Sequence, residues 1–186
     1  MMPGNCQWIN LQQLGSHSLR RTIQASLSAE GAIEGLASTY YYGIEAADKR
    51  EGYFAAKDSA DYVKAIEDEK SIEITEYNSF SMKDFTPVVR DVFKFTKSTD
   101  VNGDYIYVNP MLFAHVEASP FVNEKRDLPV EFPNQTQYTV NVVLDIPEGY
   151  VVEDKPESCN VKMSDGGLSL LYNIVHQGNK LILKYS

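Results

Sequence analysis

Thiol and imidazole side chains are the groups in this sequence best suited to nucleophilic catalysis. They are Cys6, His17, His115, Cys159 and His176. A thiol nucleophile needs a histidine base and an orienting third group within hydrogen-bond reach. Neither cysteine lies in a local catalytic signature, so a Cys–His pair brought together from distant parts of the chain is the one such arrangement left open. We expect no enzyme activity from this chain.

Metal and phosphate sites have equally weak signals. The three histidines are isolated and lack the spacing of zinc ligands. The segment from Asp100 to Asp104 has the alternating oxygen ligands of a calcium loop, but its glycine is misplaced and no distal glutamate follows. A hairpin turn at Asn102-Gly103 explains these residues fully. No glycine-rich loop precedes a helix, so we predict neither a metal nor a cofactor.

Aromatic residues make up 11% of the chain, and three of them are consecutive. Because successive side chains of a strand point to opposite faces, Tyr40, Tyr41 and Tyr42 place at least one tyrosine toward solvent. Exposed aromatic rings can stack on sugars or anchor a partner protein. The three tyrosines are therefore candidate binding residues. Ordinary cross-strand packing is the alternative interpretation.

Composition limits the classes of protein to consider. The 186 residues suit one domain or two small ones, and 43% hydrophobic residues suffice for a packed core. The net charge is −9. An acidic chain without a basic cluster argues against nucleic acid and anionic lipid as partners. No apolar run is long enough to span a bilayer, and the first residues lack the basic and apolar segments of a signal peptide.

The sequence pattern of residues 1–115 predicts an α+β module. Residues 21–28 alternate as a strand, Gly31 supplies a turn, and residues 33–42 return as the partner strand. Between about 45 and 70 the apolar period becomes helical, with Asp58 as an N-cap. Alternation then resumes, and Val89, Asp91, Phe93 and Phe95 share one face of a strand.

Residues 116–186 read as a small antiparallel β module. The clearest strand spans residues 138–146, and two further alternating segments span 168–174 and 181–185. Short strands at such spacing are typical of a sandwich-like arrangement. The predicted fold class is therefore mainly β (α+β): an antiparallel-sheet module with two short helices, followed by a small β-sandwich-like module.

A strand–turn–strand passage carries a resemblance to a known family. The segment PFVNEKRDLPVEFPNQTQYTVNVVLDIPEGYVVEDKPES resembles the C-terminal region of secreted or periplasmic transglutaminase-like proteins of Bacteroidetes-type bacteria. The matching residues are Arg126, Pro129, Val130, Ile146, Pro147, Gly149, Tyr150 and Pro156. Upstream, PGNCQW, SAEGAIEG, the Ala46–Arg50 helix and GDYIYVNPML occur in the same order as in that family. In this passage we expect Pro147 to end strand pairing, Gly149 to adopt positive φ, and Tyr150 to restart a strand with a buried side chain.

The resemblance implies a non-catalytic accessory region. The family's papain-like Cys-His-Asp core lies N-terminal to the matched region, and no residue of this chain matches that triad. The implied partner is such a core, in cis or from an adjacent gene, and the implied location is periplasmic or secreted. The alternative is a free-standing β-rich module that binds polysaccharide or a surface protein. The ligand, the oligomeric state and the pathway stay open.

Overall fold

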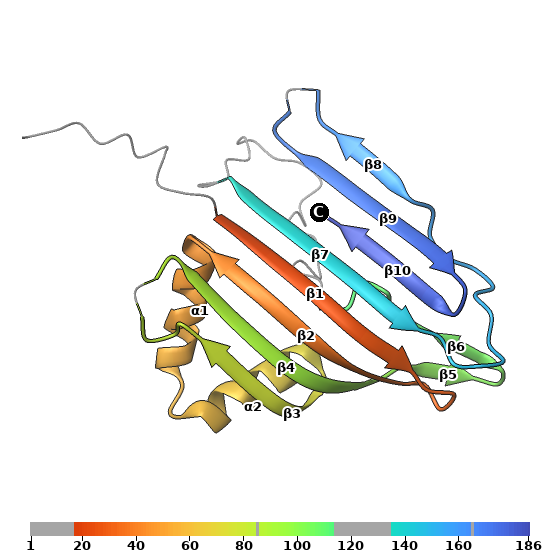
Figure 1. Ribbon diagram of the computed structural model, residues 1–186, viewed down its shortest axis with the longest axis horizontal. Helices are drawn as coiled ribbons and strands as arrows, with labels where there is room; N and C mark the ends of the chain where they lie inside the picture. The colour runs from red at the N-terminus through yellow and green to blue at the C-terminus, as the bar shows by residue number, and fades with distance from the viewer. Residues whose placement is uncertain (1–16, 85, 114–134, 165) are drawn as a thin grey trace, which may run out of the picture.

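A single large mixed sheet dominates the computed structural model of the chain, which describes residues 17–84, 86–113, 135–164 and 166–186 (Figure 1). Within these residues the strand order is β3-β4-β2-β1-β7-β10-β9-β8, and β5 and β6 form a separate two-stranded ribbon. The strands are β1 (His17–Leu27), β2 (Ala32–Tyr42), β3 (Glu73–Phe80), β4 (Val88–Ser98), β5 (Asp100–Asn102), β6 (Tyr105–Tyr107), β7 (Thr136–Asp145), β8 (Cys159–Lys162), β9 (Ser169–Gln177) and β10 (Lys180–Tyr185). The helices are α1 (Ile44–Ala55) and α2 (Ser59–Lys70).

The β1–β2 hairpin forms where the alternating pattern predicts it. Gly31 adopts a φ of +82°, which a residue with a Cβ rarely adopts. From Leu19 to Ser26 the side chains of β1 alternate between buried and exposed. Ser18, directly before this range, is also buried. This alternation gives the sheet an apolar face and a polar face.

A side chain accepts a hydrogen bond from the first turn of each helix, locally in α2 and from β1 in α1. The Asp58 side chain accepts a hydrogen bond from Asp61 N at 2.9 Å, so the predicted N-cap of α2 is confirmed. At the start of α1, Nδ1 of His17 accepts a hydrogen bond from Ile44 N at 2.9 Å. Helix α1 contacts β1, β2 and β4, and α2 contacts β3, so both cover the same end of the sheet (Figure 1).

The core lies on the helix-covered face of the sheet. Its fully buried side chains include Ile23, Ile33, Phe95, Val142 and Leu183, which come from five strands. By register, the residues between these positions project to the opposite face, which no helix of the described chain covers. We call this second surface the open face.

The predicted mainly β fold class with two short helices is confirmed, but one pairing differs from an all-antiparallel arrangement. Strand β7 pairs with β1 in parallel, in a register that runs from His17 opposite Thr136 to Ser26 opposite Asp145. The strands expected to form a sandwich-like second module therefore extend the first sheet. The apolar periodicity within a strand does not predict this arrangement, because it carries no information on which strand pairs with each edge of the sheet. The predicted boundary at residue 115 lies outside the described residues, and the division into two modules stays a prediction.

The turn after β7 follows the expectation in its first half. Ile146 N donates to Asn179 O at 2.7 Å, and Tyr150 N donates to Pro147 O at 3.2 Å, which closes a four-residue turn. Gly149 has a φ of +88°, as a type II turn requires at its third position.

The second half of that expectation is wrong. No strand restarts at Tyr150, since the next strand begins at Cys159, and Tyr150 is 38% exposed. The physical reason is the lack of a neighbour. β1 ends at Leu27 and β10 begins at Lys180, so no strand among the described residues lies beside residues 150–152 to pair with them. Tyr150 instead places its hydroxyl 3.4 Å from the carbonyl oxygen of Ala29.

Candidate functional site

The three consecutive tyrosines divide between the two faces of β2. Tyr41 is buried, and its hydroxyl donates to Asp91 Oδ2 at 3.0 Å. Tyr40 is 38% exposed and Tyr42 is half-buried, and both project from the open face. Two of the three candidate binding residues are therefore placed where they can meet a ligand, and Tyr41 is a core residue.

Two arginines and a phenylalanine accompany the tyrosines on the open face. In the register Arg20 on β1 lies opposite Tyr40 on β2, Tyr40 lies opposite Arg90 on β4, and Arg90 lies opposite Phe80 on β3. We call these four residues and Tyr42 the Arg–aromatic row. The sequence pattern could not assemble it, because β2 pairs with β4 and not with the next strand along the chain.

Cation–π contacts hold the row together. The guanidinium carbon of Arg90 lies 5.0 Å from the ring centre of Tyr40 and 5.5 Å from that of Phe80. Arg90 Nε also donates to Ser38 Oγ at 3.2 Å. The guanidinium carbon of Arg20 lies 5.7 Å from the ring centre of Tyr42. The row is an ordered surface that alternates positive charge with π-electron faces.

A buried ion pair joins α1 to the sheet on the other face. Lys49 Nζ lies 2.7 Å from Asp91 Oδ2, and the Asp91 side chain is 1% exposed. Lys49 also lies 5.0 Å and 5.2 Å from the ring centres of Tyr41 and Tyr62. Burial by itself lowers the pKa of Lys49, but the neighbouring Tyr41 and Asp91 outweigh burial and hold that pKa above its usual range. Burial, with Asp91 nearby, raises the pKa of Tyr41.

One buried and one partly buried arginine position loops and contact no candidate ligand site. Arg21 Nε donates to Thr39 Oγ1 at 3.0 Å, and its Nη1 donates to the Phe113 carbonyl at 2.6 Å. Arg50 Nη2 lies 2.6–3.0 Å from three carbonyl oxygens, those of Ser81, Asp84 and Thr86. The arginine of the Ala46–Arg50 helix motif thus fixes the loop between β3 and β4.

Apolar side chains are exposed at the other end of the sheet, on its helix-side face. Val161 lies opposite Leu170 in the β8–β9 pairing, and Met163 N donates to Leu168 O at 2.9 Å in the same hairpin. Their exposed fractions are 57% for Val161, 43% for Leu170, 51% for Met163 and 59% for Leu168. We call these four residues the β8–β9 patch.

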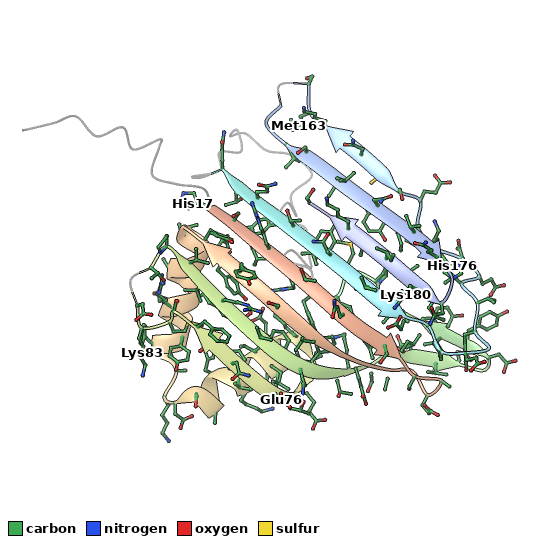
Figure 2. All side chains as sticks on the ribbon, in the orientation of Figure 1. His17, Glu76, Lys83, Met163, His176 and Lys180 are labelled. Atoms are coloured by element: carbon green, nitrogen blue, oxygen red, sulfur yellow. The ribbon has the colours of Figure 1, made fainter. Side chains whose placement is uncertain are left out.

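The β8–β9 patch continues the hydrophobic core toward the edge of the sheet. Ile174 on β9 and Leu183 on β10 are buried on the same face, and the patch begins where burial ends. Figure 2 shows Met163 at the tip of the β8–β9 hairpin, remote from α1 and α2. Large contiguous apolar patches on folded proteins are typical of interaction surfaces.

The thiol and imidazole groups of the described residues lie apart. Cys159 is exposed and lies opposite Tyr172 on β9, while His176 lies four residues further along the same strand. At about 3.3 Å per residue this is a separation of roughly 13 Å, well beyond hydrogen-bond reach. Figure 2 shows His176 at the opposite end of β9 from Met163. Cys6 and His115 lie outside the described residues.

The remaining residues of the passage that resembles the transglutaminase-like proteins lie either in a turn or irregular segment or outside the described residues. Pro147 and Gly149 form the turn after β7, and Pro156 lies in the irregular segment before β8. Arg126 and Pro129 lie outside the described residues. Within residues 17–84, 86–113, 135–164 and 166–186, no cluster of three or more His, Cys, Asp or Glu is arranged to hold a metal ion. Neither helix there has the length and apolar character to cross a membrane.

Comparison with known proteins gives one family. Residues 104–186 match the family described as "Domain of Unknown Function with solved-structure structure (DUF3858)". No curated protein and no solved structure matches the chain. The matched segment begins in the β5–β6 hairpin and includes β7 to β10, and so contains the β8–β9 patch. It leaves out the helices, β1 and β2, and every residue of the Arg–aromatic row. The C-terminal strands of this chain are thus similar to a domain of unknown function.

Proposed function

We propose that this chain is a non-catalytic accessory module of a transglutaminase-like protein and that it docks on the catalytic core through the β8–β9 patch. The ordered set of motifs that resembles the C-terminal region of such proteins supports the identity of the partner. By the same resemblance, the module works in the periplasm or outside the cell, in bacteria of the Bacteroidetes type. It supports the core or contacts the substrate of the core.

The β8–β9 patch is the observation that carries the docking proposal. Val161, Met163, Leu168 and Leu170 form a block two residues wide on one face of a hairpin. Complete burial of one such side chain contributes about 1.5–3 kcal/mol. An interface centred on four of them has the apolar, water-excluded centre that is typical of protein–protein interfaces.

The placement of thiol and imidazole groups supports a non-catalytic role. In the described part of the chain, Cys159 lies opposite Tyr172, away from the position of His176 on β9. The other described histidine, His17, uses its Nδ1 to accept the first amide of α1. Neither imidazole is placed to serve as the base for Cys159.

The test is co-purification with the polypeptide encoded directly upstream of this chain in its own genome. We expect that polypeptide, in frame or one frameshift away, to have Cys, His and Asp in papain-like order and to form a one-to-one complex with this chain. Val161→Ser combined with Leu170→Ser should weaken the complex at least tenfold, because both side chains lie in the apolar centre. The matched control is Val175→Ser, which removes a valine that is 44% exposed on the open face of β9.

Three outcomes would overturn the docking proposal. The first is an upstream region without a papain-like domain. The second is a complex as sensitive to Val175→Ser as to the double substitution in the patch. The third is self-association of the chain through the patch, seen as a dimer in light scattering that the double substitution converts to a monomer.

A second candidate function is a free-standing module that binds polysaccharide or a surface protein. The placement of Tyr40 and Tyr42 on the open face favours it. This function uses the face opposite to the β8–β9 patch. The two candidates are therefore separable by substitutions on different faces of the sheet.

A further inference from the structure

The Arg–aromatic row offers two positive charges that no acidic side chain of the described chain neutralises. The ion pairs of the sheet strands are Lys49–Asp91, Lys94–Glu76 and Lys180–Asp145, and neither Arg20 nor Arg90 takes part in one. Arg90 uses Nε to bind Ser38, which leaves the donors of its two terminal amino groups for a further acceptor. A carboxylate can accept two parallel hydrogen bonds from such a group.

The open face is more basic than the chain as a whole. By register, its basic side chains are Arg20, Arg90, Lys94, Lys162, Lys180 and Lys184. Its acidic side chains on the same strands are Glu34, Glu73, Glu76 and Asp145. Basic residues are thus in excess here, whereas acidic residues outnumber basic ones by 26 to 17 in the sequence. An anionic ligand would therefore meet a favourable charge on this face.

The spacing of the row favours a sugar polymer over a peptide. Tyr40 and Phe80 lie two strands apart, as do Arg20 and Arg90, which corresponds to about 9.5 Å. An extended peptide presents same-side groups about 6.6 Å apart, which does not match this interval. The row runs across β3, β4, β2 and β1, so a ligand that covers it crosses the strands and cannot pair along the free backbone edge of β3. Pyranose rings stack on aromatic rings and carry carboxylates at their rims, which suits alternating aromatic and guanidinium groups.

Nucleic acid fits the row less well. A phosphate backbone carries a charge at every residue and is bound by a continuous basic surface. Here the row has two arginines, and the acidic Glu34, Glu73 and Glu76 lie four or more residues further along the strands of the same face. Two separate positive charges suit a ligand that carries few, widely spaced negative charges.

We propose that the Arg–aromatic row binds a carboxylate-bearing polysaccharide, with sugar rings on Tyr40 and Phe80 and carboxylates on Arg20 and Arg90. The inference deepens the second candidate function and does not depend on docking to a catalytic core. Carboxylate binding needs the planar fork of arginine, which lysine lacks. Arg90→Lys should therefore lose most of the affinity although it keeps the charge.

The experiment is a titration of the full chain with hexagalacturonate, followed by nuclear magnetic resonance and by calorimetry. We expect Arg90→Gln, Arg90→Lys and Tyr40→Ala each to weaken binding at least tenfold. Matched controls are Lys184→Gln, a basic residue of the open face outside the row, and Tyr105→Ala, a tyrosine that is 53% exposed on β6. Both controls should bind within twofold of the unsubstituted chain. Circular dichroism and thermal unfolding confirm that every variant is folded.

Four results would overturn the inference. One is a chain that does not bind hexagalacturonate. Another is equal binding of a neutral galactan oligomer, since the carboxylates would then not be recognised. A third is equal competition by poly-L-glutamate, since the sugar rings would then not be recognised. The last is equal loss on Lys184→Gln and Arg90→Gln, which would indicate general charge attraction. Loss of binding to a catalytic core by the β8–β9 patch variant leaves this titration unchanged, so the two proposals fail separately.

Discussion

Asp91 is a carboxylate in an otherwise apolar row of inward-facing residues. Val89, Phe93 and Phe95 of the same strand are buried around it, and Asp91 itself is fully buried. Burial of a charge is costly unless the charge is paired and hydrogen-bonded, and Lys49 and Tyr41 provide that pairing. The ion pair therefore ties α1 to the centre of the sheet.

Removal of one member of this pair should be far more costly than removal of an exposed one. We expect Lys49→Met to lower the free energy of unfolding by about 3–5 kcal/mol, because Asp91 then keeps its charge without its cationic partner. The matched control is Lys64→Met in the exposed pair Lys64–Asp68, which should cost less than about 1 kcal/mol. Urea unfolding measures both values.

A double substitution checks the coupling between the two residues. Lys49→Met with Asp91→Asn should cost less than the sum of the two single substitutions, because it leaves no charge buried alone. Equal costs for Lys49→Met and Lys64→Met would contradict the structural role of the buried pair.

Several tyrosines make the stability of the protein sensitive to alkaline pH. Burial and a hydrogen bond to Glu45 raise the pKa of Tyr138 to about 12, and burial also raises the pKa of Tyr77. In the unfolded chain tyrosine titrates near 10, so the folded state retains protons that the unfolded state has released. This contribution is complete below pH 10 and is lost as the pH rises through about 12.

The measurement is the free energy of unfolding between pH 8 and pH 12. We expect it to decline above pH 10, and Tyr138→Phe should make the decline shallower because one shifted group is removed. A free energy of unfolding that rises between pH 8 and pH 12 would contradict this prediction, because groups with raised pKa values make it fall with pH.

The sequence predicts some of these residues and misses others for a physical reason. The alternation that places Asp91 among apolar neighbours is itself the signal of a buried charge. The same signal exists for Arg21, which lies between Leu19 and Ile23. The partners of these charges could not be predicted. Lys49 lies on a helix and Phe113 lies in a loop far along the chain, and periodicity reports only neighbours within one element.

The sequence predicts the individual helices, strands and turns better than it predicts which strands pair. The N-cap at Asp58, the turn at Gly31 and the inward face of β4 agree with the expectations from pattern. The expected strand at Tyr150 is wrong because a strand needs a paired neighbour as well as suitable residues. The parallel β1–β7 pair was also missed, since it joins segments more than 100 residues apart.

The β1–β7 pairing implies that the segment similar to DUF3858 depends on the rest of this chain. That segment begins at residue 104, but β7 forms one of its two ladders with β1, at residues 17–27. We expect a fragment of residues 104–186 to be unfolded or aggregated alone, because the edge of β7 and the apolar side chains of β7 lose their cover. Addition of a fragment of residues 1–103 should restore ordered structure.

Circular dichroism and amide hydrogen exchange on the separate and mixed fragments provide the measurement. A fragment of residues 104–186 that unfolds cooperatively on its own, with stability equal to that of the full chain, would show that β7 does not need β1. The full chain at the same concentration is the reference for both fragments.

The described part of the molecule is dominated by one wide sheet with two dissimilar faces. The helix-side face carries the apolar core, with Arg21 and Asp91 buried in it, and the β8–β9 patch lies at the end of this face that neither α1 nor α2 contacts. The open face is polar and carries the Arg–aromatic row. Fold class follows from the sequence because alternation is a property of each strand, whereas both surfaces depend on strand order, which the sequence pattern does not specify.

The most direct measurement of the central claim is amide hydrogen exchange of this chain with and without the papain-like domain that we propose is encoded upstream. Docking through the β8–β9 patch predicts slower exchange in residues 159–163 and 168–174 when the domain is added. Exchange in α1, α2 and β3 should be unchanged, because these elements lie at the other end of the sheet. Slower exchange confined to those three elements, or unchanged exchange in the β8–β9 hairpin under saturating conditions, would contradict the account.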